Sequence, residues 1–185
     1  KTSAEIPFLP ISFFKSHLVK NKDLPVQLTF KSSGTTGMER SKHAIQVPEM
    51  YLASFRKTYR EQMGNPRDQV ILALLPNYLQ QGESSLVYMV NDLIQMTNSF
   101  ISGFVLDDPD TLLSRYSEAL KAKKKLVIFG VSYALLDLAE KKVDLSEATI
   151  IETGGMKGRR KELTKEELHE ELKSGLNVPF ICSEY

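Results

Sequence analysis

The residues that point most directly to chemistry form the loop Ser32-Ser33-Gly34-Thr35-Thr36-Gly37, which follows an apolar strand ending near Phe30. Four hydroxyl side chains fall within five positions, and the two glycines permit backbone shapes that other residues resist. Backbone amides and hydroxyls grouped in this way can surround phosphate oxygens. Arg40 and Lys42 follow closely and can add charge-assisted contacts. The loop therefore predicts a phosphate site, with a flexible Ser/Gly hairpin loop as the alternative.

The loop differs from two common phosphate-binding motifs. A Walker A loop needs Gly followed by Lys at the positions where Glu39 and Arg40 stand. The Gly-x-Gly-x-x-Gly pattern of dinucleotide folds is also missing.

Four segments together resemble adenylate-forming ligases. Ser32 to Gly37 resembles the phosphate loop of that superfamily, which includes acyl-CoA synthetases, peptide-synthetase adenylation domains and luciferases. Its usual Gly-x-Pro-Lys ending is replaced by Gly37-Met38-Glu39-Arg40, so Arg40 stands where Lys is expected. Ile6 to Lys15 resembles the lead-in of acyl-protein synthetases and phenylacetate–CoA ligases. Thr153 to Gly158 and Ser183-Glu184-Tyr185 are similar to the adenine segment and to the start of a Tyr-Gly-x-Thr-Glu motif.

The resemblance implies ATP-dependent activation of a fatty acid, as in long-chain-fatty-acid luciferin-component ligases, followed by acyl transfer to a protein thiol. The alternative is an acyl- or aryl-CoA ligase. The resemblance assigns residues as follows: phosphates to Ser32, Ser33, Gly34, Thr35, Thr36 and Gly37 with Arg40 or Lys42, adenine to Gly154, Gly155 and Tyr185, and the acyl–phosphate junction to Tyr78. Mg²⁺ would accompany ATP, with its ligand expected beyond residue 185. The implied partners are a carboxylic acid and an acyl-accepting reductase or coenzyme A.

Taken singly, the weaker segments also have plain structural explanations. A proline-rich surface arm, a Gly-Gly turn, a buried last strand and a packed tyrosine at position 78 would account for them. A non-catalytic nucleotide-binding fragment therefore stays open as an alternative of another class.

A second constellation suggests a serine hydrolase or acyltransferase. Gly130-Val131-Ser132-Tyr133-Ala134 nearly matches the Gly-x-Ser-x-Gly nucleophile elbow. Asp137 or Asp144 with His169 follows in the required order, but only 37 positions separate Ser132 from His169. A full α/β-hydrolase sheet does not fit in that length, so a strand–turn–helix corner is the favoured interpretation.

Apolar strands alternate with amphipathic helices along the chain. We expect strands at Leu28–Phe30, Val70–Leu75, Phe100–Leu106, Lys125–Phe129, Thr149–Glu152 and Val178–Cys182. Helices are expected at Val47–Met63, at Ser84–Met96, from the opening Asp107-Asp108-Pro109 to about Lys123, at Ser132–Lys141 and from Thr164, where Glu167 completes a capping box. This alternation predicts an α/β fold with a mostly parallel sheet flanked by helices. Ligands bind such sheets at the carboxyl ends of the strands, so we expect the site in the loops after Phe30, Leu75, Phe129, Glu152 and Cys182.

Composition sets limits on the function. Twenty-four basic and 23 acidic side chains give a net charge of +1, which does not indicate a nucleic-acid partner. The single cysteine, Cys182, excludes an internal disulfide and fits a cytoplasmic location. We expect no membrane span and no metal site in this chain. Residues 1–185 are expected to be one adenylating domain with residues 1–25 as an arm, cut from a longer enzyme and inactive by itself.

Overall fold

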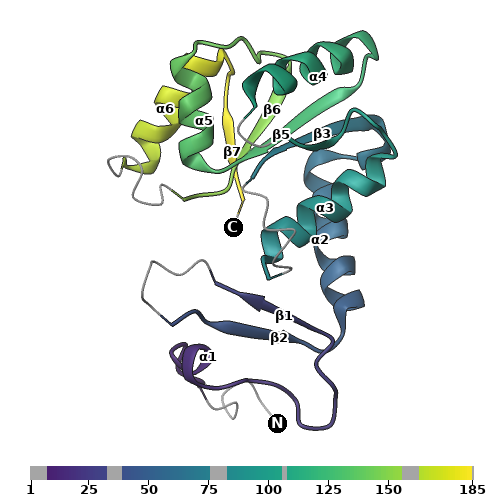
Figure 1. Ribbon diagram of the computed structural model, residues 1–185, viewed down its shortest axis with the longest axis vertical. Coiled ribbons are helices and arrows are strands. Elements are labelled where there is room, and N and C mark those ends of the chain that lie inside the picture. Colours follow the sequence, from purple (N-terminus) through teal and green to yellow (C-terminus); the bar gives the residue numbers. More distant parts are fainter. Residues whose placement is uncertain (1–7, 33–38, 76–82, 106–107, 156–162, 185) are drawn as a thin grey trace.

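A five-stranded parallel sheet lies in the upper part of the molecule as seen in Figure 1. The computed structural model describes residues 8–32, 39–75, 83–105, 108–155 and 163–184. The strands are β3 (Gln69–Leu74), β4 (Gly103–Phe104), β5 (Lys125–Gly130), β6 (Ala148–Glu152) and β7 (Ile181–Ser183), in the order β4-β3-β5-β6-β7. The predicted α/β class with a mostly parallel sheet is therefore confirmed.

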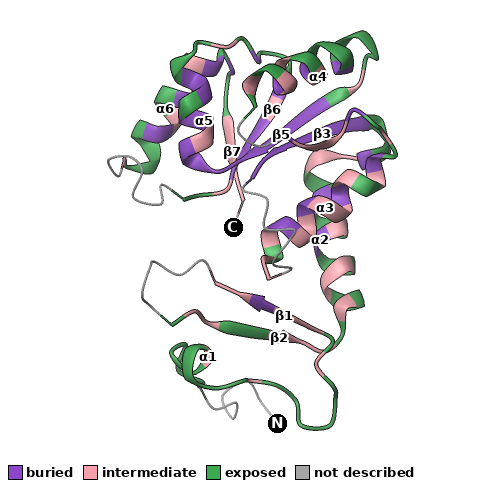
Figure 2. Cartoon of the chain, in the orientation of Figure 1, coloured by how far each residue is buried: buried purple, intermediate pink, exposed green. Residues whose placement is uncertain are grey.

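Helices cover both faces of this sheet. They are α2 (Pro48–Met63) and α3 (Ser85–Thr97) on one face and α4 (Pro109–Lys121), α5 (Ser132–Glu140) and α6 (Lys165–Leu176) on the other. Successive residues of β3 point to opposite faces, so Leu72 packs with α4 and α5 while Ile71 packs with α2 and α3. All six residues of β3 are buried (Figure 2). The apolar run Val70–Leu74 follows from this burial, and the side chain of Gln69 at the start of the strand hydrogen-bonds to the Tyr59 hydroxyl and the Met63 carbonyl.

Several helix boundaries follow the sequence signals. The capping box predicted at Thr164 and Glu167 is present and starts α6. Asp108 caps α4, with Pro109 in its first turn. Ser84 caps α3, accepting a hydrogen bond from the Val87 amide at 3.3 Å. Such local contacts satisfy amides that have no partner inside a helix.

A separate two-stranded sheet corrects one sequence-based expectation. β1 (Leu28–Lys31) was expected to belong to the parallel sheet, but it pairs antiparallel with β2 (Lys42–Ile45), a strand that the sequence analysis missed. Only residues 32–41 connect the two strands, which is short for the crossover that parallel pairing needs. The loop after Phe30 therefore belongs to this β1–β2 hairpin and is not a strand-to-helix loop of the parallel sheet. A short helix, α1 (Phe13–Ser16), precedes the hairpin.

Two strands are shorter or shifted relative to the prediction. β4 has two residues instead of the expected Phe100–Leu106, because Phe100 is 91% exposed and the Ser102 hydroxyl accepts from the Ile71 amide in place of a backbone partner. β7 starts at Ile181 instead of Val178. The left-handed Asn177 ends α6, and Phe180 is 56% exposed before the strand begins.

No helix in the described part of the chain is long and apolar enough to cross a membrane. A 3₁₀ turn, η2 (Pro66–Asp68), joins α2 to β3.

Candidate functional site

The carboxyl edge of the parallel sheet, where its strands end, contains a topological switch point. After β3 the chain turns to α3 on one face, whereas after β5 it turns to α5 on the opposite face. β3 and β5 are hydrogen-bonded neighbours in the sheet, so the two connections leave adjacent strands toward opposite faces. In open α/β sheets such a divergence leaves a crevice where ligands bind. This edge faces the β1–β2 hairpin (Figure 1).

One buried aromatic side chain docks the hairpin at this edge. Phe30 of β1 is 4% exposed, and its ring lies 5.4 Å from Tyr51 of α2 and 5.5 Å from Tyr88 of α3. The Tyr51 hydroxyl donates to the Ser85 carbonyl at 3.2 Å. Offset and edge-on ring pairs at such distances are favourable beyond the area that they bury. The hairpin is thus held against the N-terminal turn of α3.

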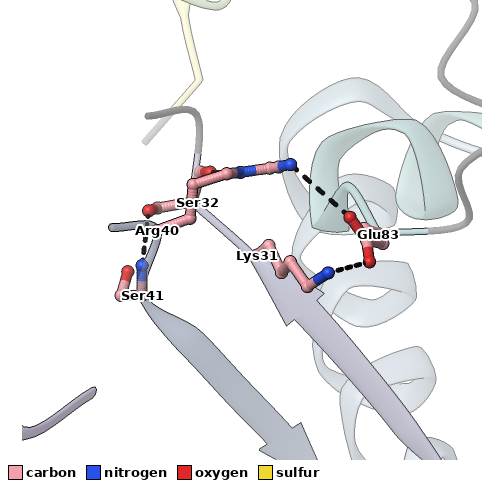
Figure 3. A network of polar contacts seen from close by, with 5 residues as sticks. All are labelled: Lys31, Ser32, Arg40, Ser41 and Glu83. Atoms are coloured by element: carbon pink, nitrogen blue, oxygen red, sulfur yellow. Dashed lines mark hydrogen bonds and ion pairs between the residues drawn. The ribbon is translucent and has the colours of Figure 1, made fainter. Parts of the chain in front are cut away.

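Glu83, which lies just before α3, contacts residues on both sides of the loop between β1 and β2 (Figure 3). Its carboxylate forms an ion pair with Lys31 of β1 and a longer one, 3.5 Å, with Arg40, which precedes β2. The Lys31 amide also donates to the Glu83 carbonyl at 2.8 Å. Glu83 lies between β3 and α3, so the base of the hairpin is fixed to the chain that leaves the switch point.

The base of the predicted phosphate loop is closed by hydrogen bonds. The Ser32 amide donates to the Ser41 carbonyl and the Ser41 amide to the Ser32 hydroxyl, both at 3.0 Å. Arg40 Nε donates to the Ser32 carbonyl at 2.6 Å. The structure therefore brings Ser32 and Arg40 together, and Lys42 lies in β2 opposite Lys31.

A second group of residues lies at the ends of β5 and β6. The Ser132 hydroxyl and the Gly154 amide both donate to Glu152 Oε1, each at 2.5 Å. Gly130 and Glu152 are register partners, and the pairing continues past the strands because the Thr153 amide donates to the Gly130 carbonyl at 3.0 Å. Ser132 is 2% exposed and Glu152 is 6% exposed.

This geometry is unfavourable for the hydrolase hypothesis. Ser132 donates to a carboxylate, while His169 Nε2 forms its hydrogen bond with the Ser183 hydroxyl at 3.3 Å. Asp144 accepts from the Ser146 amide and from Asn177. A serine nucleophile needs a histidine base within hydrogen-bond reach, and the described contacts of Ser132 do not supply one.

Gly154 and Gly155 both have backbone angles that favour glycine. Their φ values are +74° and +97°, and a Cβ built on either would meet no atom of the described residues within 4 Å. Glycine is therefore required here by conformation and not by crowding. Among the described residues, no atom occupies the space where a flat ligand group could lie beside these two glycines.

Glu184 adds a third carboxyl group to the edge. Its amide donates to the Glu152 carbonyl at 2.9 Å, and burial raises the pKa of its side chain above the usual value. The pKa of Tyr51 is raised by burial and then by the negative charge of Glu184. The backbone of Glu184 is therefore fixed to the end of β6.

Several predicted site residues lie outside the described part of the chain, namely Ser33, Gly34, Thr35, Thr36, Gly37, Tyr78 and Tyr185. The described residues contain no group of three or more His, Cys, Asp or Glu side chains that could hold a metal ion. A shallow hollow of ≈ 510 Å³ lies between α5 and α6, lined by residues such as Leu136, Glu140 and Glu171. It is on an outer helical face, away from the switch point, so the hydrogen-bonded groups at the edge are the stronger candidate.

Sequence reasoning missed three acidic residues of the site. Glu83 directly precedes a predicted helix without any motif of its own, and Glu184 lies in the Ser183-Glu184-Tyr185 segment, where the resemblance assigned a role to Tyr185 alone. Glu152 does carry a signal, since an ionisable side chain ends an otherwise apolar strand directly before Gly154-Gly155. Buried carboxylates are unusual unless they have hydrogen-bond partners.

No family model, no curated protein sequence and no solved structure matches this chain.

Proposed function

We propose that this protein binds ATP at the carboxyl edge of the sheet and activates a fatty acid as an acyl-adenylate, which then passes to a protein thiol. One observation carries the proposal: Glu83 ties both ends of the loop that resembles an adenylate-forming phosphate loop to the connection leaving the switch point. The predicted phosphate loop and the predicted ligand-binding edge therefore belong to one connected structure.

The proposed reaction has two steps. A carboxylate oxygen bonds to the α-phosphorus of ATP, and the bond from that phosphorus to the bridging oxygen breaks, so pyrophosphate leaves. A thiolate then attacks the acyl carbonyl carbon, and AMP leaves with the electron pair of the broken bond. Because negative charge moves onto the departing group, preorganised donors and cations lower the barrier.

The residues present at the edge suit parts of this task. Arg40 uses Nε and Nη1 in the contacts described above, while its side chain is 37% exposed, so guanidinium donors remain for phosphate oxygens. Gly154 and Gly155 would lie beside adenine, and the lack of described atoms within 4 Å of their Cβ positions supports this part of the proposal. Tyr185 on the other face of adenine, and Tyr78 beside the acyl group, are part of the proposal by resemblance.

Binding of a triphosphate at this edge must overcome the negative charge of the nearby carboxylates. Glu83 is balanced by Lys31 and Arg40, and Glu152 by two hydrogen-bond donors. Triphosphate brought close to them still needs extra positive charge. Mg²⁺ would supply it by neutralising and polarising the phosphate oxygens, with its protein ligand proposed beyond residue 185.

Nucleotide binding and ATP–pyrophosphate exchange with a fatty acid test the proposal. Thr35→Ala and Gly37→Val remove a hydroxyl donor and a permissive backbone position from the loop. A hydrogen bond to a charged oxygen contributes about 1.5–3 kcal/mol, so each substitution should weaken ATP use at least about tenfold. Unchanged ATP binding and exchange in both variants would refute the assignment.

A separate experiment identifies whether the acyl group passes to a protein thiol or to coenzyme A. Under the proposal, labelled acyl groups appear on a protein cysteine, either of this enzyme or of an acyl-accepting reductase. Release of acyl- or aryl-coenzyme A instead would identify a coenzyme A ligase using the same first step. A cytoplasmic location belongs to the proposal because the reaction consumes ATP.

A further inference from the structure

Ser132, Glu152 and Gly154 form a buried connection that we call the Ser132–Glu152 clip. Glu152 Oε1 accepts from the Ser132 hydroxyl and from the Gly154 amide, each at 2.5 Å. The Ser132 amide in turn donates to the Gly154 carbonyl at 3.3 Å. Gly154 therefore has both its backbone groups bound, one directly by Ser132 and one through the carboxylate of Glu152.

The Ser132–Glu152 clip restrains the Gly154–Gly155 turn, which would otherwise adopt many conformations. Gly154 and Gly155 are consecutive glycines with positive φ, and no side chain of the described residues packs where their Cβ atoms would be. Glycine loses more conformational freedom on ordering than any other residue. A ligand that needs this turn in one shape would bear that cost on binding unless the protein has already fixed the turn.

The clip is itself held rigidly. Ser132 begins α5, directly after β5, and Glu152 is the last residue of β6. The Thr153 amide and hydroxyl both donate to the Gly130 carbonyl, at 3.0 and 3.3 Å. A Cβ on Gly130 would lie 2.6 Å from Leu135, so helix α5 packs closely against this corner. Side chains on a strand end and a helix start position a turn more accurately than side chains on loops.

We infer that Ser132 and Glu152 are positioning residues for nucleobase binding, because they hold the Gly154–Gly155 turn in the shape that accepts a flat purine. This inference rests on the proposed function and assigns a role to the elbow-like Ser132 other than that of a nucleophile. Neither residue needs to touch the ligand. The triphosphate end of the ligand contacts the hairpin side of the edge, so it does not depend on the clip.

The test compares ATP with inorganic tripolyphosphate as ligands in calorimetric titrations. Ser132→Ala and Glu152→Ala should each weaken ATP binding about tenfold or more and reduce the preference for ATP over GTP, with tripolyphosphate binding unchanged. Glu152→Gln keeps an oxygen acceptor for both donors and should restore ATP binding to within about threefold of the wild-type protein. Asp144→Ala is the matched control, since it removes a carboxylate that accepts from the Ser146 amide and Asn177 in the connection from α5 to β6, at the opposite edge of the sheet.

NMR spectra of the backbone amides report on the conformation of the Gly154–Gly155 turn without any ligand. In the wild-type and Glu152→Gln proteins the Gly154 amide proton should exchange slowly and resonate at low field, as expected for an amide bound to a side-chain oxygen. In Glu152→Ala both features should be lost, with the remaining spectrum unchanged.

The possible outcomes distinguish the proposed nucleotide binding from the positioning role of Ser132 and Glu152. If the wild-type protein binds neither ATP nor tripolyphosphate, the proposed function fails and the inference fails with it. If wild-type binding is present but Glu152→Ala behaves like Asp144→Ala, or loses ATP and tripolyphosphate equally, the positioning role alone is overturned. Labelling of Ser132 by a fluorophosphonate would also overturn it, in favour of a nucleophile.

Discussion

Replacing Phe30 with alanine tests whether a single aromatic side chain holds the β1–β2 hairpin on the sheet. Phe30 is the one buried residue of β1, and the residues of β2 are exposed or half-buried. Its partners Tyr51 and Tyr88 belong to α2 and α3, which pack on the sheet by other contacts as well. The substitution should therefore affect the hairpin and leave the parallel sheet folded.

The expected magnitude follows from the burial. Truncating a buried phenylalanine to alanine costs about 3–5 kcal/mol, and the lower value applies because the neighbouring Tyr51 and Tyr88 are only half-buried. The ion pairs of Glu83 remain, but their partners are about one-third exposed, and such pairs contribute about 1 kcal/mol or less. An isolated two-stranded hairpin is only marginally stable. A loss of about 3 kcal/mol corresponds to roughly a hundredfold more frequent opening of the hairpin.

Hydrogen exchange measured by mass spectrometry or NMR is the direct assay. Amides of β1 and β2 in Phe30→Ala should lose protection about a hundredfold, while amides of β3, β5 and β6 keep theirs. ATP binding should weaken in parallel, because the proposed phosphate loop joins the two strands. Phe100→Ala is the control, since Phe100 is 91% exposed and distant in sequence. Unchanged hairpin protection, or an equal loss across the parallel sheet, would show that the docking argument is incorrect.

Three further predictions concern other parts of the molecule. Arg40→Ala should weaken ATP binding about tenfold more than Lys42→Ala, because a guanidinium can contact phosphate through two donors; the reverse ranking would assign the phosphate role to Lys42. Burial raises the pKa of Glu184, so its contribution to folding stability is present below about pH 4.5 and is lost as the pH rises through the raised pKa. Glu184→Gln should flatten that decline in urea-unfolding measurements, and an unaltered pH profile would contradict the assignment. Gly175→Ala should lower Tm despite better helix propensity, because the new Cβ would lie 2.6 Å from both the Cβ and the carbonyl oxygen of Ala139; a raised Tm would show that α5 and α6 can separate without cost.

The sequence was sufficient for the features that depend on neighbouring residues. The apolar run at Val70–Leu75 predicted β3 because a strand buried on both faces needs apolar side chains at every position. Thr164 and Glu167 predicted the start of α6 because a capping box closes within four residues. Regular alternation of such elements also predicted the parallel sheet, since parallel strands require crossover helices.

Tertiary structure decided the features that depend on distant partners. The sequence placed the strand at Phe30 in the main sheet, but the short connection to Lys42 and the burial of one ring made it a docked hairpin. Lys31 and Glu83 are 52 residues apart, and Ser132 and Glu152 are 20 apart. Local propensity does not encode such pairs, because which strand ends meet depends on the order of strands in the sheet. The residue types at Ser32, Arg40 and Gly154 led to the prediction of a nucleotide site, which stays a prediction, and the assembled sheet edge decided that Glu83 contacts Arg40 and that Glu152 contacts Gly154.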